Sequence, residues 1–211
     1  MSFEEDVKAG DIEAVRTALE ADQQLAYSSS EDGTPLLMLA KYFGHSDIAN
    51  EIASKRRTLN MHEAASMNNV NQLLQAIDSS GDVDGYSTDG FTSLGFACYF
   101  GNFDAAQTLL DAGADPNLAY TGFIKAAPLH SALSGKHSDI VQLLLERGAS
   151  PLAPSGEGWT PLHYAAHNGD SDLVRYFLSK GANLQARSKD GKTPLDLANE
   201  QGFVSVSALL A

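Results

Sequence analysis

The sequence predicts an all-α solenoid, a stack of short helices that follow one another in pairs. The clearest pair lies between residues 158 and 182. Thr160 is suited to be a helix N-cap, and Pro161 suits the first helical position, where its missing N–H costs nothing. Apolar residues recur at helical spacing on both sides of Gly169, which breaks the first helix. Gly181 provides the left-handed residue that ends the second helix, so this segment is predicted to form one complete helix–turn–helix unit.

The unit recurs along the chain at a nearly fixed period. Thr193 lies 33 residues after Thr160, Ala127 lies 33 before it, and Thr92 lies a further 35 before Ala127. A period of this length is typical of a repeat protein, whose core runs between neighbouring repeats. The Thr-Pro-Leu-His signature from Thr160 and the Gly-Ala ending closely resemble the ankyrin-repeat family. The resemblance implies a β-turn finger and two antiparallel helices per repeat, in a curved, right-handed stack of about seven units.

We expect a single domain over residues 1–211, with a cap repeat at each end. The predicted boundaries are 1–22 for the N-terminal cap, 33–57, 58–81, 91–114, 126–149 and 159–182 for the repeats, and 192–211 for the C-terminal cap. The repeat at 58–81 is the weakest, because the connection before it is too short for a finger. Either the inner wall has a gap there or the two halves kink. Gly44 arrives one residue late after Thr34-Pro35, which predicts a small irregularity in that first helix.

The charge of the chain limits its partners. The net charge is −13, whereas nucleic acid and anionic membranes need a basic surface. Residues 58–124 hold eight acidic residues and no Lys or Arg, so this acidic middle serves solubility or faces a basic partner. No apolar run approaches the roughly 20 residues of a membrane span, and the acidic stretch 2–6 is unlike a secretory signal. We therefore expect no nucleic acid, no membrane and a cytoplasmic location.

No residue pattern predicts catalysis, a cofactor or a metal. His62, His130 and His163 occupy the histidine position of the ankyrin signature, where the resemblance implies a structural hydrogen bond between adjacent fingers. His163 and His167 have the spacing of zinc ligands on a helix, but no further Cys or His shares the repeat. Cys98 is the only cysteine, so an internal disulfide is excluded, and it occupies a packed position. We expect a protein that is not an enzyme.

The candidate binding residues are large side chains at positions that repeat packing does not need. In the ankyrin architecture, the residue before the N-cap threonine and the two residues before the inter-helix glycine face the concave groove. Here these positions hold Tyr42, Phe43, Phe91, Tyr99, Phe100, Trp159 and His167. Aromatic side chains are enriched among interface hot spots. The opposing interpretation is that some of these rings fold over the neighbouring repeat and belong to the core.

The sequence thus predicts a non-catalytic module, monomeric on its own, that binds another protein through a concave, aromatic-lined and acidic surface. A basic partner surface would suit the acidic middle. The alternative hypothesis is an inhibitor or immunity-type subunit that occludes the active site of a basic enzyme. A stoichiometric, salt-sensitive complex that abolishes the partner's activity would distinguish the inhibitor from a scaffold.

Overall fold

The computed structural model describes residues 2–121 and 125–211, and in this part of the chain all regular structure is helical apart from two isolated β-bridges. Fourteen α-helices follow one another there, and each odd-numbered helix packs against the next. They are α1 (Phe3–Ala9), α2 (Ile12–Ala21), α3 (Leu36–Tyr42), α4 (Ser46–Ser54), α5 (Met61–Ser66), α6 (Val70–Ser80), α7 (Ser93–Phe100), α8 (Phe103–Asp111), α9 (Pro128–Ser134), α10 (Ser138–Glu146), α11 (Pro161–Asn168), α12 (Ser171–Ser179), α13 (Pro194–Glu200) and α14 (Val204–Leu210), with a short 3-10 helix η1 (Gln23–Tyr27) after α2.

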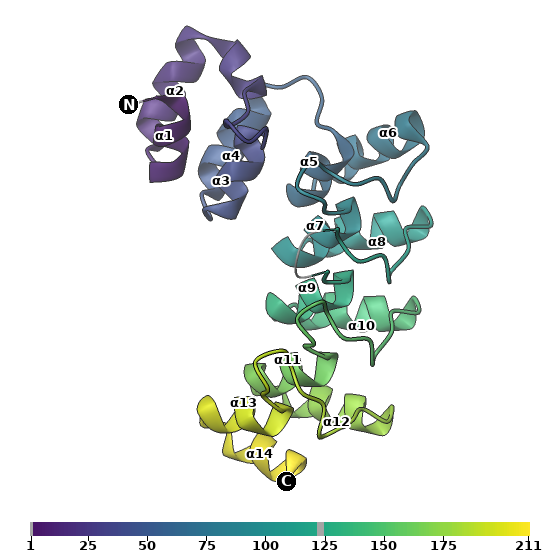
Figure 1. Ribbon diagram of the computed structural model, residues 1–211. Coiled ribbons are helices and arrows are strands. Elements are labelled where there is room, and N and C mark those ends of the chain that lie inside the picture. The colour runs from purple at the N-terminus through teal and green to yellow at the C-terminus, as the bar shows by residue number, and fades with distance from the viewer. Residues whose placement is uncertain (1, 122–124) are drawn as a thin grey trace.

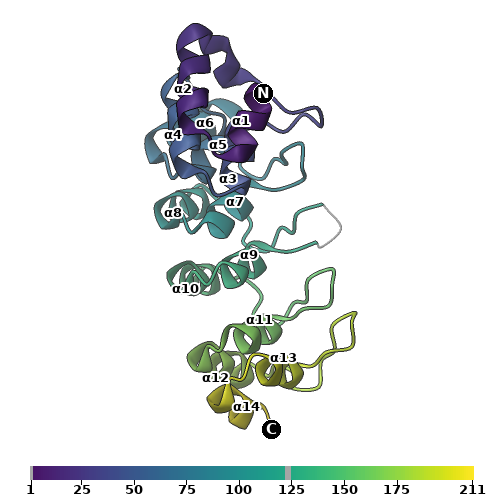
Figure 2. The same ribbon diagram turned by 90° about the vertical axis from the view of Figure 1, so that its left-hand side faces the viewer.

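The helix pairs are stacked. Figure 1 shows the pairs from α5 onwards as a column, with α5, α7, α9 and α11 on one side and α6, α8, α10 and α12 on the other. Helices α1 to α4 form a group beside the top of this column. Loops project from one edge of the stack, as Figure 2 shows. We call the side formed by the first helices of the pairs and these loops the first-helix face.

Helix α11 shows why these residues form the unit that they do. The Thr160 hydroxyl accepts a hydrogen bond from the backbone N–H of His163, which satisfies a donor that the helix leaves free. The helix ends at Gly169, whose φ of 75° is left-handed and therefore favours glycine. Leu162 and Ala165 are fully buried. Because alanine is small, neighbouring first helices can approach closely, and the core forms between pairs rather than inside any one of them.

The loops are tight fingers with a shared hydrogen bond at the base. In the fingers at 29–35, 86–92, 154–160 and 187–193, the backbone N–H of a serine donates to the carbonyl four residues later, over 2.8 to 3.0 Å. Three histidines connect first helices to the loop of the following pair. The Nε2 atoms of His62, His130 and His163 lie 3.0, 2.9 and 3.1 Å from the carbonyl oxygens of Gly85, Ala153 and Lys192. The structural role implied for these histidines is therefore confirmed.

Helix α3 is regular, so the irregularity predicted within it is wrong. The N-cap of α3 is Pro35, one residue later than the Thr34 that the motif indicates, and it provides no side-chain cap. Gly44 then lies eight positions after the start of α3 at Leu36, as Gly169 lies eight after Pro161. The Thr-Pro-Leu motif has moved by one position relative to the helix that it introduces.

The connection from α4 to α5 contains no finger. We call the contact between the α3/α4 and α5/α6 pairs the N-terminal junction. Arg56 fixes this connection, because its Nε donates to the Ala26 carbonyl at 2.5 Å and its guanidinium forms an ion pair with Glu63. The side chains of Arg56 and Glu63 are only 5% and 4% exposed. Arg57 donates its backbone N–H to the Tyr27 hydroxyl at 3.1 Å. Helices α4 and α6 make almost no contact.

A second opening lies between the α9/α10 and α11/α12 pairs, which we call the C-terminal junction. At three boundaries of the described chain, a ring covers the glycine that ends the preceding first helix: His45 over Gly10, His137 over Gly101 and Phe203 over Gly169. A methyl group on Gly101 would lie 2.4 Å from the His137 ring, and one on Gly169 would lie 2.9 Å from the Phe203 ring. These rings fill the space between successive turns.

The C-terminal junction has neither the glycine nor the ring. Lys136 takes the glycine position with a φ of 61°, and Asp170 takes the position of the ring. Helices α10 and α12 make almost no contact. A cavity of about 580 Å³ opens between them, and its lining includes Leu145, Leu173 and Tyr176. The two neighbouring pairs are therefore separated between α10 and α12.

Candidate protein-binding surface

The seven predicted binding residues fall into separate groups. Tyr42 and Phe43 lie at the end of α3, Tyr99 and Phe100 lie at the end of α7, and Phe91 lies on the finger at 86–92. Trp159, on the finger at 154–160, and His167, near the end of α11, lie two pairs further along the stack. The structure thus brings together Tyr42, Phe91, Tyr99 and Phe100 in one place and Trp159 with His167 in another.

The first group is built around the buried ring of Phe96. Phe91 stacks on Phe96 with centroids 5.0 Å apart, and Phe100 and Tyr42 each lie 6.3 Å from it. Tyr99 meets Phe100 edge-on at 5.1 Å. We call these five residues the N-terminal aromatic cluster. Its rings come from the second and the fourth helix pairs, so α3 reaches past α5 to contact α7.

Members of this cluster differ in how much they offer a partner. Phe91 also stacks on Tyr120 at 4.4 Å, so both of its faces are covered. Phe100 is half-buried, and the Lys41 ammonium lies 4.7 Å from its centroid, within cation–π range. Tyr99 and Tyr42 are 46% and 38% exposed. The tyrosines are thus the accessible part of the cluster, while the two phenylalanines mainly support it.

Tyr42 joins the cluster to the acidic finger of the fourth pair. Its hydroxyl donates to the carboxylate of Asp89. Burial raises the pKa of Tyr42, and the hydrogen bond to the Asp89 carboxylate raises it further, so the hydroxyl stays a donor. Phe43 stands apart, because its 51% exposed ring stacks on His45 at 6.3 Å and contacts none of the clustered rings. Of Tyr42 and Phe43, only Tyr42 belongs to the N-terminal aromatic cluster.

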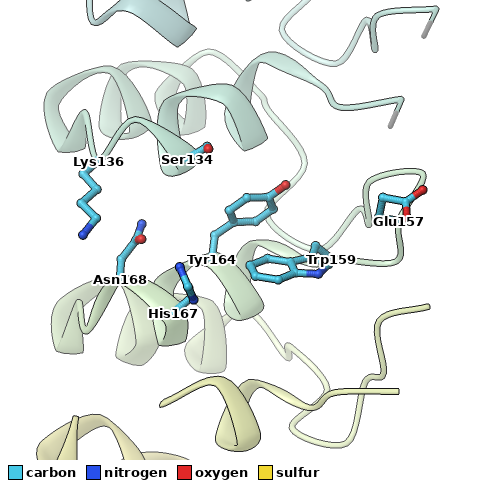
Figure 3. Close-up of a pocket in the computed structure, with 7 residues that line it drawn as sticks. All are labelled: Ser134, Lys136, Glu157, Trp159, Tyr164, His167 and Asn168. Atoms are coloured by element: carbon cyan, nitrogen blue, oxygen red, sulfur yellow. The ribbon is translucent and has the colours of Figure 1, made fainter. Parts of the chain in front are cut away.

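The second group lines a cleft on the first-helix face at the C-terminal junction. The cleft has a volume of about 360 Å³ and is lined by Ser134, Lys136, Glu157, Trp159, Tyr164, His167 and Asn168. We call it the tryptophan cleft. The Trp159 centroid lies 5.0 Å from that of Tyr164 and 5.5 Å from that of His167, in edge-on contacts. Figure 3 shows these three rings between Lys136 and Asn168 at one end and Glu157 at the other.

Tyr164 is a cleft residue that the sequence prediction missed. It lies three positions before His167 on α11, and residues at that spacing share a face of a helix. The spacing could have identified it once His167 was chosen. Burial raises the pKa of Tyr164, so its hydroxyl remains a neutral hydrogen-bonding group. The cleft therefore holds three adjacent rings, each with a polar tip.

The polar groups of the cleft are unequally occupied. Asn168 donates to the Leu133 carbonyl at 2.6 Å, which ties α11 to α9, and Glu157 pairs with Lys189 at 3.2 Å. Within the described residues, Lys136 forms no ion pair, and the buried Nδ1 of His167 has no hydrogen-bond partner. The cleft can thus offer the Lys136 cation beside an aromatic floor.

The acidic residues of 58–124 do not form one patch. Asp84 and Asp89 lie on the loop before α7, where the Asp84 carboxylate accepts from the Asp115 backbone N–H at 3.0 Å. Asp104 and Asp111 lie on α8, in the second-helix layer, and Asp111 pairs with Arg147 at 2.7 Å. On the first-helix face, the acidic charge is therefore concentrated at the fingers rather than spread along the rings.

Other chemical candidates have structural surroundings. Cys98 is fully buried, and burial raises the pKa of its thiol. Among residues 2–121 and 125–211, no group of three or more His, Cys, Asp or Glu side chains is placed to hold a metal ion. In the same part of the chain, no helix has both the length and the apolar character needed to cross a membrane.

Comparison with known proteins identifies the family. The family model described as ankyrin repeats (3 copies) matches residues 61–155 and 129–211. The chain belongs to the ankyrin-repeat family. Ankyrin repeats are generally protein–protein interaction modules, and the family is generally non-catalytic. The match begins at the start of α5, so the four helices before the N-terminal junction lie outside it.

The relatives of this ankyrin-repeat protein share only parts of their length with it. SMC5-SMC6 complex localization factor protein 1 of Bos taurus is 30% identical over 126 residues, which are 59% of this chain and 11% of that protein. Ankyrin repeat and SOCS box protein 16 of Mus musculus is 32% identical over 108 residues, 47% of this chain and 23% of the relative. A putative ankyrin repeat protein of Rickettsia felis is 39% identical over 59 residues, which are 28% of this chain and 26% of that protein. The chain thus spans a quarter or less of the first two relatives.

Proposed function

We propose that this ankyrin-repeat protein is a non-catalytic binding module whose partner protein docks on the first-helix face. The observation that supports this most is the tryptophan cleft, because its adjacent Trp159, Tyr164 and His167 rings form a floor on which an anchoring side chain can pack. Tyr99 and Tyr42 supply a second contact further along the same face. The helix stack is already folded, so little ordering entropy opposes association.

The charges indicate the kind of partner that we propose. Asp89 and the neighbouring acids at the fingers favour a basic partner surface near the N-terminal aromatic cluster, and they would steer its approach. The cleft differs, because Lys136 offers a positive group at one end. We therefore propose a partner that places an apolar or aromatic side chain in the cleft and basic residues towards the fingers. We propose that the chain is monomeric before it binds, that it binds neither nucleic acid nor membrane, and that it acts in the cytoplasm.

The test begins with capture of partners from native lysate at low and high salt, followed by binding of the captured protein to variants. Trp159→Ala is expected to weaken binding by about 1–4 kcal/mol and to leave far-UV circular dichroism nearly unchanged. Trp159 is the only tryptophan, so its fluorescence reports directly on docking in the unmodified protein. Val204→Ala is the matched control, because Val204 is 80% exposed on α14. An unfolded Trp159→Ala protein, or an unchanged affinity, would remove the cleft from the proposal.

A second candidate function is inhibition of a basic enzyme. The acidic finger residues around Asp89 favour it, because they could enter a positively charged active site. In that case the complex would be stoichiometric and sensitive to salt, and the enzyme's turnover would stop when it forms. A captured enzyme that keeps full turnover when saturated with this protein would exclude inhibition and leave the binding module.

A further inference from the structure

The absent finger at the N-terminal junction leaves a slot. The N-caps Pro35 and Asn60 are 25 positions apart, against 33 between Thr160 and Thr193. The fingers at 29–35 and 86–92 therefore flank a space that a finger would otherwise occupy. This space is a cavity of about 290 Å³, whose lining includes Gly33, Pro35, Met38, Thr88 and Phe96. In Figure 2 the two flanking loops project from the same edge of the stack.

Neighbouring fingers elsewhere are joined by a backbone hydrogen bond. Thr121 donates its N–H to the Gly90 carbonyl at 3.0 Å, and Lys189 donates to the Glu157 carbonyl at 2.9 Å. Thr88 is the equivalent donor on the finger at 86–92, since each of these three residues directly follows the one whose N–H closes the finger base. An intact preceding finger would supply the acceptor for it.

In the slot, both sides of this pairing are free. The backbone N–H of Thr88 donates to no described residue. On the opposite wall, the carbonyls of Asp32 and Gly33, which correspond to those of Glu157 and Gly90, accept no backbone hydrogen bond from the described residues. A free donor thus faces free acceptors across a gap that a chain segment would fill, as at an exposed sheet edge that receives an added strand.

The charge around the slot is negative. Glu31 and Asp32 are exposed on one finger and form no ion pair in the described part of the chain. The Ser30 hydroxyl and the Thr34 backbone N–H hydrogen-bond to the Asp32 carboxylate and lower its pKa, which keeps it ionised. No Lys or Arg lines the cavity. Pro35, Met38 and Phe96 give it an apolar floor.

We propose that the slot receives a tight turn of the partner protein that carries a lysine or arginine. The turn takes the place of the absent finger, accepts from Thr88, donates to the carbonyl of Asp32 or Gly33, and places its cation beside Glu31 and Asp32. The aliphatic part of a long basic side chain covers the apolar floor. This inference rests on the proposed function, because it assigns a second contact to the same partner.

The chain provides its own probe for this test. The finger at 187–193 reads Arg-Ser-Lys-Asp-Gly-Lys-Thr, and the finger at 86–92 reads Tyr-Ser-Thr-Asp-Gly-Phe-Thr, a turn of the same length without a base. Each is made as a disulfide-cyclised peptide and titrated into the full ¹⁵N-labelled chain. We expect saturable amide shifts at Thr88 and Gly33 with the basic peptide, and at least tenfold weaker binding of the neutral one. Equal binding of both peptides, or no shift at Thr88, would overturn the proposal.

Two variants complete the experiment. Glu31→Lys combined with Asp32→Asn removes the negative charge and keeps an oxygen that can accept from the Ser30 hydroxyl and the Thr34 N–H, so the finger is retained, and the basic peptide should bind at least tenfold more weakly. A variant that carries residues 186–193 inserted between Thr58 and Leu59 fills the slot and should not bind it. If Trp159→Ala abolishes capture of the partner but the variant with the filled slot still captures it, the slot proposal is overturned and the proposed function is kept. Capture that neither change affects would overturn both.

Discussion

The two junctions of this stack share an open second-helix layer, where α4 barely contacts α6 and α10 barely contacts α12, and they differ in their fingers. The N-terminal junction has lost its finger, yet a buried ion pair between Arg56 and Glu63 and the hydrogen bond from Tyr42 to Asp89 cross it. The C-terminal junction keeps its finger, at 154–160, and the His130 imidazole hydrogen-bonds with the Ala153 carbonyl across it. Both junctions lack a ring between helices, since nothing lies within 4 Å of a methyl group on Gly44, and Asp170 stands where His137 and Phe203 cover glycines elsewhere.

The comparison shows that finger and helix layers are held by different interactions. Fingers are joined by backbone hydrogen bonds, which any sequence can make if the loop is present. Helix layers depend on the volumes of the side chains at each boundary. The slot lies where a finger is absent, and the tryptophan cleft lies on the first-helix face of the junction at which α10 and α12 separate.

The largest effect is expected from Arg56→Met at the N-terminal junction. The change leaves Glu63 buried without its partner, which typically costs about 3–5 kcal/mol. Urea unfolding followed by far-UV circular dichroism measures it. Arg16→Met is the control, since Arg16 pairs with Glu13 and Glu51 but is 49% exposed, and such pairs contribute about 1 kcal/mol or less. Equal losses in the two variants would show that the ion pair does not hold the junction.

The ring-over-glycine contact is tested by Gly101→Ala. A methyl group there would lie 2.4 Å from the His137 ring, and the φ of 74° is unfavourable for alanine, so we expect a loss of about 2–4 kcal/mol. In Gly33→Ala, φ is 85° and nothing lies within 4 Å of the added carbon, so only the backbone cost of about 1–2 kcal/mol applies. The difference between the two free energies of unfolding measures the ring contact, and no difference would contradict it.

Acid is expected to weaken the region on both sides of the C-terminal junction. Burial lowers the pKa of His130 on α9 and of His163 on α11 below 6.5. The unfolded chain therefore takes up protons first, and stability falls as pH drops below about 6.5. Each histidine contributes a slope of at most about 1.4 kcal/mol per pH unit. Unfolding free energies between about pH 7 and pH 5 should show a shallower slope in His130→Gln than in the unmodified protein. An identical slope would assign the acid sensitivity elsewhere.

The smallest expected effect is an increase in the free energy of unfolding. Lys136→Gly places glycine at a φ of 61° and should stabilise the protein by about 1 kcal/mol. Asn68→Gly is the contrasting change at a φ of 53°, because it removes the side-chain Oδ1 of Asn68, which accepts from the Ala105 backbone N–H at 2.9 Å. Thermal unfolding of the two variants should therefore shift in opposite directions. A destabilised Lys136→Gly protein would show that this lysine supports the junction.

The sequence predicted the parts of the fold that local rules determine. Thr160, Gly169 and Gly181 act on their own helix ends, so the pattern placed the helices correctly. It misplaced the start of α3, because Pro35 is compatible with both an N-cap and a first helical position. The sequence pattern did not predict the contacts across the junctions. Tyr42 meets Phe100 past the intervening α5/α6 pair, and no local pattern encodes that contact.

For the candidate site, the sequence indicated large side chains but not their exposure. Phe91 and Tyr99 were chosen by the same rule, yet the ring of Phe91 is stacked on both faces while Tyr99 stays accessible. The difference depends on Tyr120, which comes from the next loop. The open C-terminal junction had no local signal of its own, because Asn68 and Asn102 depart from the pattern in the same way at a boundary where α6 and α8 stay in contact.

The direct link between α4 and α5 also limits how far α1 to α4 can move from the rest of the stack. Six residues, 55–60, separate these helices, and a fully extended segment of that length reaches about 20 Å. If the Arg56 contact opens, α1 to α4 cannot drift further than this from the rest of the stack. So short a link keeps the separated surfaces at a high effective concentration, which favours their rapid reassociation. The short link thus makes opening of the N-terminal junction reversible.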